Sequence, residues 1–175
     1  MTTRIAFLRA VNLGKRTVKM SRLVQIIEEL GYEGAWTHIN SGNVVFDAAG
    51  SHADIEHLIE DALEAELGFE VTTFVRTAAE LRKALHVDPF PVNDGDTYFI
   101  TFLKTAPSAA TTKALEAASN DFDTLAVRGR DVHWRMRGRS TATTVTRKTW
   151  NLVGEHGSTS RNVTMLRKLG AKLGP

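Results

Sequence analysis

The sequence contains no cysteine. Disulfide bonds and thiolate metal sites are therefore excluded, and the composition suits a reducing compartment without requiring one. Long apolar runs are missing too. The run at residues 5–8 is too short for a signal peptide, and no stretch approaches membrane-spanning length. These absences predict a cytoplasmic protein without a membrane partner.

Catalytic and metal-binding patterns are equally scarce. His52 and His57 lie on a predicted acidic helix at a spacing that does not place them on one face, so we expect no metal site. Residues 14–17, Gly-Lys-Arg-Thr, invite interpretation as a phosphate loop. That motif needs a glycine at position 9 and Ser or Thr at position 16, where arginines stand. Nucleotide hydrolysis of that kind is excluded, and no cofactor is predicted.

The distribution of charge is uneven along the 175 residues, although the net charge is only +2. Residues 1–22 contain six basic and no acidic side chains, residues 23–127 five basic and eighteen acidic, and residues 128–175 eleven basic and two acidic. Two basic ends therefore flank an acidic middle. This pattern indicates a partner with phosphates or carboxylates, or basic ends that neutralise acidic helices within the fold.

The first half of the chain predicts a ferredoxin-like βαββαβ unit. Its periodicity and turn signals indicate a central strand at 4–11, a helix from Ser21 to about 30, a hairpin at 35–46, a helix from Ser51 to Gly68, and a strand at 70–76. A capping box at Thr77 and Glu80 then starts a further helix. We place the boundary in the turn-rich region that follows, which gives subdomains at 1–90 and 91–175.

The second half repeats this order of elements only in part. A strand at 98–103, a helix from Ser108 to 118 and a hairpin of strands 122–128 and 131–137 are predicted. Residues 141–153 keep a helical spacing although they are rich in β-branched residues, and 161–169 form a short helix. The predicted class is therefore α+β, with two ferredoxin-like subdomains, the second incomplete, and C-terminal helices.

The loop after the first strand is the first candidate site. Arg9 lies near the end of that strand, Lys15 within the loop, and Lys19 and Arg22 on either side of Ser21 at the start of a helix. Cations are disfavoured by the dipole at a helix start, whereas anions bind there readily. The loop is thus either an anion site or a solvated basic segment.

The hairpin turn at residues 40–43, Asn-Ser-Gly-Asn, is the second candidate. It presents amides and a hydroxyl, but these residue types are also what a tight turn requires sterically, and we favour the steric interpretation. If the strand before the turn runs antiparallel to the first strand, the turn and the basic loop lie at opposite ends of the sheet. We therefore expect the two motifs not to share a pocket.

Two further candidates lie in the basic C-terminal part. In the strand at 132–137, Val132, Trp134 and Met136 should face a core, with His133, Arg135 and Arg137 on the other side. Such a basic face suits nucleic acid, a smaller anion or the protein's own acids, although RNA-binding sheets expose aromatic side chains. Residues 160–162, Ser-Arg-Asn, would start a helix with a cation.

Four motifs together resemble the family called domain of unknown function 1697, whose members are mainly bacterial. They are LRAVNLG…VKM, THINSGNVVF, VRTAAEL and SRNVTMLRKL. The resemblance runs from about Ile5 to Leu169. It implies two ferredoxin-like subdomains in an α+β arrangement and no established activity. Ala10, Lys15 and Val163 depart from the family pattern, which usually has Gly, Gly and Trp there. The resemblance carries over the residues Arg9, Asn12, Gly14, Lys19, Ser41, Gly42, Asn43, Arg161 and Asn162.

Charge and motifs together predict a non-catalytic module that binds an anionic, phosphate-bearing ligand. One alternative is an enzyme on a phosphorylated or carboxylated small molecule, with Arg9 and Lys19 as anchors and His38 as general base. Another is a nucleic-acid-binding protein, and a third is that the motifs only lock turns. The sequence does not determine the oligomeric state. The predicted ligand-binding residues are Arg9, Asn12, Lys15, Lys19, Ser41, Asn43, Arg135, Arg137, Arg161 and Asn162.

Overall fold

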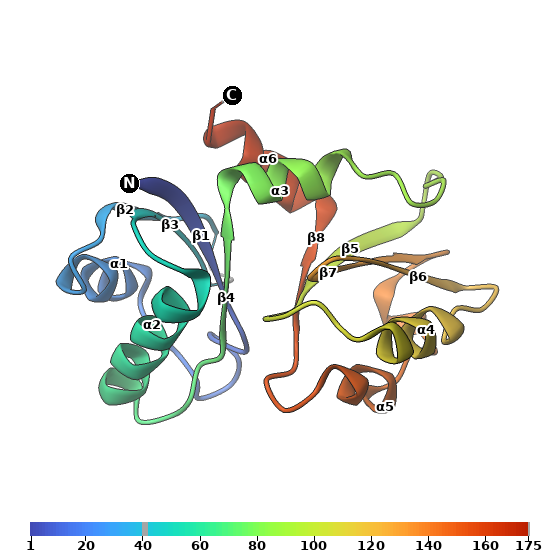
Figure 1. Cartoon of the computed structure of the whole chain (residues 1–175), viewed down its shortest axis with the longest axis horizontal. Coiled ribbons are helices and arrows are strands. Elements are labelled where there is room, and N and C mark those ends of the chain that lie inside the picture. The colour runs from blue at the N-terminus through green and yellow to red at the C-terminus, as the bar shows by residue number, and fades with distance from the viewer. Residues whose placement is uncertain (40–41, 175) are drawn as a thin grey trace. The chain divides into compact units, whose positions relative to one another are not determined.

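The computed structural model describes residues 1–39 and 42–174 (Figure 1). The chain divides into two compact units, Met1–Leu81 and Arg82–Pro175. The division falls within α3 (Ala78–His86), earlier in the chain than the turn-rich region after residue 86 in which the sequence placed the boundary.

The first unit contains the predicted βαββαβ order. Its sheet has the order β2-β3-β1-β4, and each neighbouring pair is antiparallel. This is the ferredoxin-like arrangement, in which β1 is central, so the α+β prediction is confirmed for this unit. Its elements are β1 (Thr2–Leu8), α1 (Met20–Glu29), β2 (Glu33–Thr37), β3 (Asn43–Ala48), α2 (His52–Leu67) and β4 (Thr73–Thr77).

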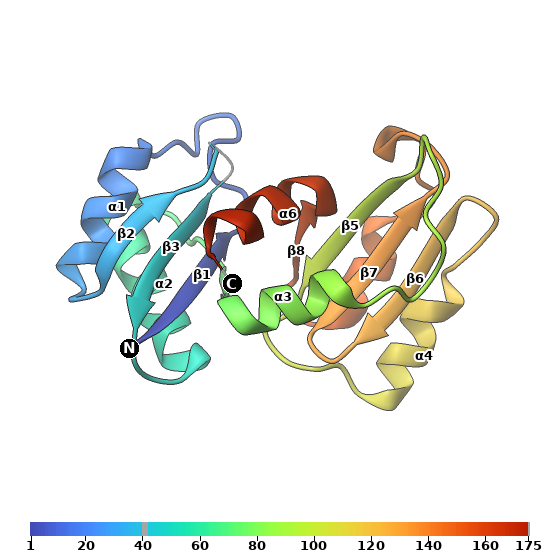
Figure 2. The ribbon, with the colours of Figure 1, turned by 90° about the horizontal axis from the view of Figure 1, so that it is seen from above.

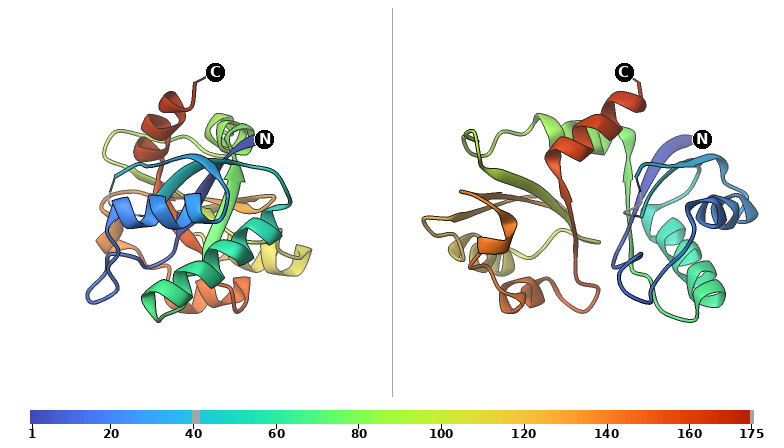
Figure 3. Two further views of the ribbon diagram at one scale, coloured as in Figure 1. Left: turned by 90° about the vertical axis from the view of Figure 1, so that its left-hand side faces the viewer. Right: turned by 180° about the vertical axis from the view of Figure 1, so that it is seen from behind.

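Helices α1 and α2 cover one face of this sheet (Figures 1 and 3). Because side chains alternate along a strand, Ala6 and Leu8 of β1 point into the core that these helices complete. Helix α2 begins as predicted at Ser51, whose hydroxyl accepts a hydrogen bond from the Asp54 N–H at 3.1 Å. It ends at Gly68, which adopts the left-handed conformation (φ 76°) typical of a helix C-cap.

Strand β4 lies at the edge of the sheet, and its outward N–H groups donate hydrogen bonds to carboxylates. An uncovered edge is a template for pairing with other chains, so these bonds protect the fold. Two of these carboxylates come from the acidic helix α2, and one of them, Glu56, is only 4% exposed. The three bonds are Thr73 N–H to Glu60 at 2.8 Å, Val75 N–H to Glu56 at 2.8 Å and Thr77 N–H to Glu80 at 2.7 Å.

The second unit is a complete ferredoxin-like unit, which corrects the prediction that it is incomplete. The missing strand is β8 (Thr159–Asn162), which pairs with β5 and gives the order β6-β7-β5-β8 (Figure 2). A strand this short, running directly into a helix, leaves no alternation in the sequence to reveal it. The other elements are β5 (Thr97–Phe102), α4 (Ala109–Ala117), β6 (Asp123–Arg128), β7 (Asp131–Met136), α5 (Arg147–Trp150) and α6 (Val163–Lys172).

Residues 141–153 do not form the predicted helix. They contain α5 and two short 3₁₀ helices, Ser140–Ala142 and Asn151–Val153. The cause lies at Asp123, which is fully buried at the start of β6. Thr143 and Thr144 donate hydrogen bonds to its carboxylate, and the backbone at these two residues is therefore drawn out of a helical conformation. Hydroxyl groups of threonine often compete with helix formation in this way.

The carboxylate of Asp123 accepts four hydrogen bonds from within the second unit. Burial raises the pKa of this group, but the bonds from Thr143, Thr144 and Trp134 outweigh burial and hold the pKa below its ordinary value. The network links β6, β7 and the segment before α5. The donors are Trp134 Nε1 at 2.9 Å, Thr143 Oγ1 at 2.6 Å, Thr144 N at 3.0 Å and Thr144 Oγ1 at 3.1 Å.

Among the residues that the structure describes, no helix combines the length and the apolar character needed to cross a membrane.

Candidate functional site

The loop between β1 and α1 is held in a defined shape by its own backbone. Ala10 and Asn12 have positive φ angles of 54° and 58°, a conformation that costs energy for residues other than glycine. Asn12 Oδ1 accepts a hydrogen bond from the Val18 N–H at 3.0 Å, which ties the two legs of the loop together. The turn Leu13–Arg16 closes with a 3.0 Å bond from the Arg16 N–H to the Leu13 carbonyl. Asn12 therefore shapes the loop from within.

Two of the basic side chains of this region are held by internal partners. Arg16 donates to the backbone carbonyls of Ala10 (3.2 Å) and Glu70, and its guanidinium lies 4.4 Å from the centre of the Phe69 ring. Arg22 pairs with Glu29 at 2.8 Å and with Glu66 at 2.7 Å. These carboxylates raise the pKa of Arg22 above its ordinary value. The fold therefore holds both side chains, and it neutralises the charge of Arg22 with carboxylates.

Arg9, Lys15 and Lys19 differ from that pair. All three are exposed, and none forms a side-chain hydrogen bond or ion pair with another described residue. Lys15 lies at the tip of the turn. Lys19 occupies the N-cap of α1, which starts at Met20, so the predicted cap at Ser21 is wrong. Among the described residues no side chain caps this helix, and its first turn has no acid, so its N–H groups and its dipole favour an anion.

The hairpin turn lies at the same end of the sheet as this loop, which corrects the expectation that the two are separated. Strands β1 and β2 both run antiparallel to β3, so they are parallel to each other, and the turn after β2 returns to the end of β1. The Leu8 N–H donates to the Gly42 carbonyl at 2.8 Å. A β-carbon at Gly42 would lie 2.4 Å from a methyl carbon of Val11. Ser41 lies outside the described residues.

Asn43 and His38 close this hairpin. Asn43 is fully buried, and its Nδ2 donates to the His38 carbonyl at 3.0 Å. The His38 N–H donates in turn to the Asn43 carbonyl at 3.0 Å. His38 is only 5% exposed, so the side chain considered as a general base is not presented at the surface. Both residues have a structural explanation.

On β7 of the second unit, Val132, Trp134 and Met136 enter a core as predicted. Arg135, on the other face, is buried beneath a turn segment. It donates to the Pro91 carbonyl at 2.8 Å and to Thr124 Oγ1 at 2.6 Å. Arg137 pairs with Asp96 at 2.9 Å. These two arginines therefore stabilise the fold of the second unit. Their contact with a ligand stays a prediction.

Arg161 and Asn162 lie in β8 and directly precede a helix, α6, which begins at Val163 and not at Arg161 as predicted. Arg161 stands opposite Ile100 in the sheet and donates to Thr159 Oγ1 at 2.7 Å. Burial lowers the pKa of Arg161 to about 10. Asn162 is the N-cap of α6, where its Oδ1 accepts a bond from the Thr164 N–H at 2.8 Å.

Comparisons with known proteins agree with this fold. The family "Protein of unknown function (DUF1697)" matches residues 1–133. The chain belongs to this family. A similar solved structure is that of the conserved bacterial protein SP0830 from Streptococcus pneumoniae, with a TM-score of 0.75 and 21% identity over 100% of this chain and 99% of that one. At this identity the likeness shows the fold. No curated protein sequence matches the chain.

The DUF1697 chain also contains a pair of residues that the sequence did not single out together. The Tyr98 hydroxyl and Nδ1 of the fully buried His133 share a hydrogen bond of 2.5 Å. Burial lowers the pKa of His133 to about 4 and raises that of Tyr98 to about 12, so both are neutral at pH 7. Strand alternation marks His133 as facing away from the core, but the sequence does not give the pairing of β5 with β7 that brings Tyr98 beside it.

The described residues of the DUF1697 chain contain no cluster of three or more His, Cys, Asp or Glu side chains arranged to hold a metal ion.

Proposed function

We propose that this DUF1697 protein binds a phosphate-bearing small molecule at the loop between β1 and α1. The observation that supports it is the contrast among the cations of this region. Arg16 and Arg22 contact other residues of the fold, whereas Arg9, Lys15 and Lys19 are exposed and have no side-chain partner among the described residues. They belong to one loop that ends at an uncapped helix N-terminus. Cations and helix N–H groups both favour a bound anion.

The shape of the loop adds to this proposal. A flexible loop loses conformational entropy when it orders around a ligand, which weakens binding. Here the Asn12–Val18 bond and the stacked Arg16 hold the backbone before a ligand arrives. The hairpin turn packs against the same region through Gly42. We therefore expect the three cations to act from a largely preformed site.

The two alternative functions have less support at this loop. A nucleic-acid site would be expected to offer aromatic side chains for stacking. The large apolar side chains exposed near the loop are Leu13 and Ile39, which have no aromatic ring. An enzyme would need a general base or nucleophile beside the anion, and the residue considered for that role, His38, is buried. Binding without catalysis is the simpler proposal.

Calorimetric titration with inorganic pyrophosphate, and with a short single-stranded RNA, tests the proposal. Replacing Arg9, Lys15 and Lys19 together by Gln should weaken pyrophosphate binding at least about tenfold, since each charge-assisted contact is lost. The matched control replaces Lys83, Lys113 and Lys148 by Gln. These lysines are also exposed, so the change in net charge is identical. The control should bind pyrophosphate like the wild type.

The salt dependence distinguishes the alternatives. A small phosphate compound gives a shallow slope of log K against log salt, whereas RNA gives a slope of about −0.7 per phosphate contacted. Equal weakening in the two triple variants, or no pyrophosphate binding at low salt, would overturn the proposal. Tight RNA binding with a steep slope and no pyrophosphate binding would favour the nucleic-acid alternative.

A further inference from the structure

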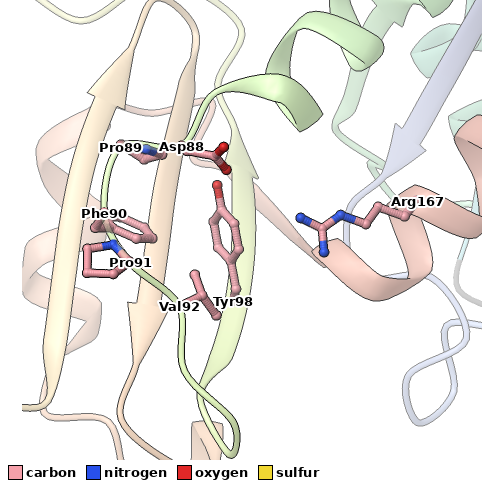
Figure 4. Close-up of a pocket in the computed structure, with 7 residues that line it drawn as sticks. All are labelled: Asp88, Pro89, Phe90, Pro91, Val92, Tyr98 and Arg167. Carbon is pink, nitrogen blue, oxygen red and sulfur yellow. The ribbon is translucent and has the colours of Figure 1, made fainter.

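The second unit contains a pocket that lies outside the ligand-binding residues predicted from the sequence. Its volume is about 650 Å³, within the range of about 300–1,000 Å³ common for small-molecule sites. Residues 88–92 form one wall, Tyr98 of β5 the base and Arg167 of α6 the opposite side (Figure 4). The first wall is mostly apolar, with Pro89, Phe90, Pro91 and Val92. Charged groups come from Asp88 and Arg167.

The apolar wall is held in place by contacts with Tyr98 and Arg135. The Phe90 ring meets the Tyr98 ring edge-on, with centroids 5.3 Å apart. The guanidinium of Arg135 lies 5.2 Å from the centre of the same Phe90 ring and also holds the Pro91 carbonyl at 2.8 Å. Arg135 is itself anchored to Thr124. The segment that forms the wall is therefore secured to the sheet although it has no regular secondary structure.

The polar end of the pocket is built around the Tyr98 hydroxyl. It forms a hydrogen bond with His133 Nδ1, and whichever group donates, the phenolic oxygen keeps at least one lone pair for a donor on a ligand. The Asp88 carboxylate lies beside this hydroxyl in Figure 4 and adds further acceptors. This end of the pocket is therefore suited to an ammonium group.

Arg167 provides the opposite charge. Its side chain extends from α6 toward Tyr98 in Figure 4. Asp88 and Arg167 are both exposed, and neither forms an ion pair with the other or with any other described residue. Two opposite charges that face one pocket without neutralising each other can each receive a counter-charge. A guanidinium is particularly suited to a carboxylate, which it binds through two parallel hydrogen bonds.

We propose that this pocket binds a zwitterionic small molecule, an α-amino acid with an apolar or aromatic side chain. The ammonium group contacts Asp88 and the Tyr98 oxygen, and the carboxylate contacts Arg167. The side chain packs against Phe90 and its neighbours, where an aromatic ring can adopt the edge-on or offset arrangement that such rings prefer. This site lies in the second unit and does not depend on the proposed anion site of the first.

Titration calorimetry with three probes tests each contact separately. The probes are L-phenylalanine, 3-phenylpropanoate, which lacks the ammonium group, and phenethylamine, which lacks the carboxylate. Arg167→Gln should weaken L-phenylalanine and 3-phenylpropanoate at least about tenfold and leave phenethylamine unchanged. Asp88→Asn should weaken L-phenylalanine and phenethylamine and leave 3-phenylpropanoate unchanged. Both residues are exposed, so these variants should fold normally.

The matched controls are Lys168→Gln, beside Arg167 on α6, and Asp94→Asn, in the turn region after Asp88. Both side chains are exposed, and both variants should bind L-phenylalanine like the wild type. The proposal is overturned if L-phenylalanine does not bind at concentrations up to about 10 mM, which corresponds to weaker than millimolar affinity. It is also overturned if Arg167→Gln and Asp88→Asn weaken all three probes equally, because the two ends of the pocket would then have no separate roles.

Discussion

Asp123→Asn should destabilise the second unit strongly, because one buried carboxylate organises three segments. Asparagine keeps one oxygen, which can still accept from Trp134 and Thr143. Its amide then faces the Thr144 N–H, which loses its acceptor. An unsatisfied buried N–H costs about 1–3 kcal/mol, and each of the two bonds that survive weakens by about 0.5–1 kcal/mol when its acceptor becomes neutral. The expected loss is about 3 kcal/mol.

The assay is urea unfolding followed by tryptophan fluorescence. Trp36 is replaced by Phe in all variants, so that the signal comes from Trp134 and Trp150 of the second unit. These two rings lie 5.2 Å apart between centroids and report on the same core. A loss of about 3 kcal/mol also lowers the melting temperature of a unit of this size by roughly 12–24 °C.

The control is Asp121→Asn, the same chemical change at an exposed position two residues earlier. It should change the free energy of unfolding by less than about 0.5 kcal/mol. The pKa of Asp123 is lowered in the folded state, so its contribution is fully present above the unfolded pKa of about 3.9 and is lost as the pH falls through the folded value. Wild type and Asp123→Asn should therefore converge at strongly acidic pH. Equal stability of the two at pH 7 would refute the reasoning.

Three further predictions concern the rest of the fold. Gly42→Ala should destabilise the first unit by about 2–4 kcal/mol in urea unfolding, because its φ of 72° is unfavourable and its new β-carbon would lie 2.4 Å from a neighbouring methyl carbon; wild-type stability would contradict this. Glu56→Ala should cost about 2 kcal/mol by leaving the Val75 N–H unsatisfied, whereas Glu64→Ala, exposed on the same helix, should cost under about 0.5 kcal/mol. The pKa of His133 falls from 6.5 to about 4 on folding, so the free energy of unfolding of the wild type should drop by up to about 3 kcal/mol between pH 6.5 and pH 4. If a His133→Asn variant showed the same pH dependence, burial of this ring would not be the cause.

The fold of the first unit was accessible to sequence reasoning because its signals are local. Ser51 and Gly68 mark the ends of α2 by their own chemistry. In the second unit, the alternation in β7 identifies the inward positions of Val132, Trp134 and Met136 in the same way. β8 was missed because a strand of this length shows no period. Its existence depends on pairing with β5, which is a long-range contact.

The residue types of the candidate site could be predicted from the sequence, but not which of its cations are exposed. The cluster of cations is visible in the sequence, yet nothing local distinguishes Arg16, stacked on Phe69, from Lys15, which is exposed. The difference depends on the segment between α2 and β4, which contains Phe69 and Glu70 and is distant in sequence from the loop. The position of the hairpin turn was wrongly inferred because β1 and β2 are not neighbours. Their parallel relation emerges only when β3 is inserted between them.

The carboxylates along β4 limit how this protein can recognise a partner. Proteins that bind extended peptides often do so by strand addition, in which the peptide pairs with a free sheet edge. At β4 the outward N–H groups of Thr73, Val75 and Thr77 already donate to glutamates. In the second unit Glu116 accepts the Val127 N–H of β6 in the same way, at 2.9 Å. The carbonyl groups of an added peptide strand would find these N–H donors already bound to glutamates. Recognition at these edges must therefore rely on side chains and loops.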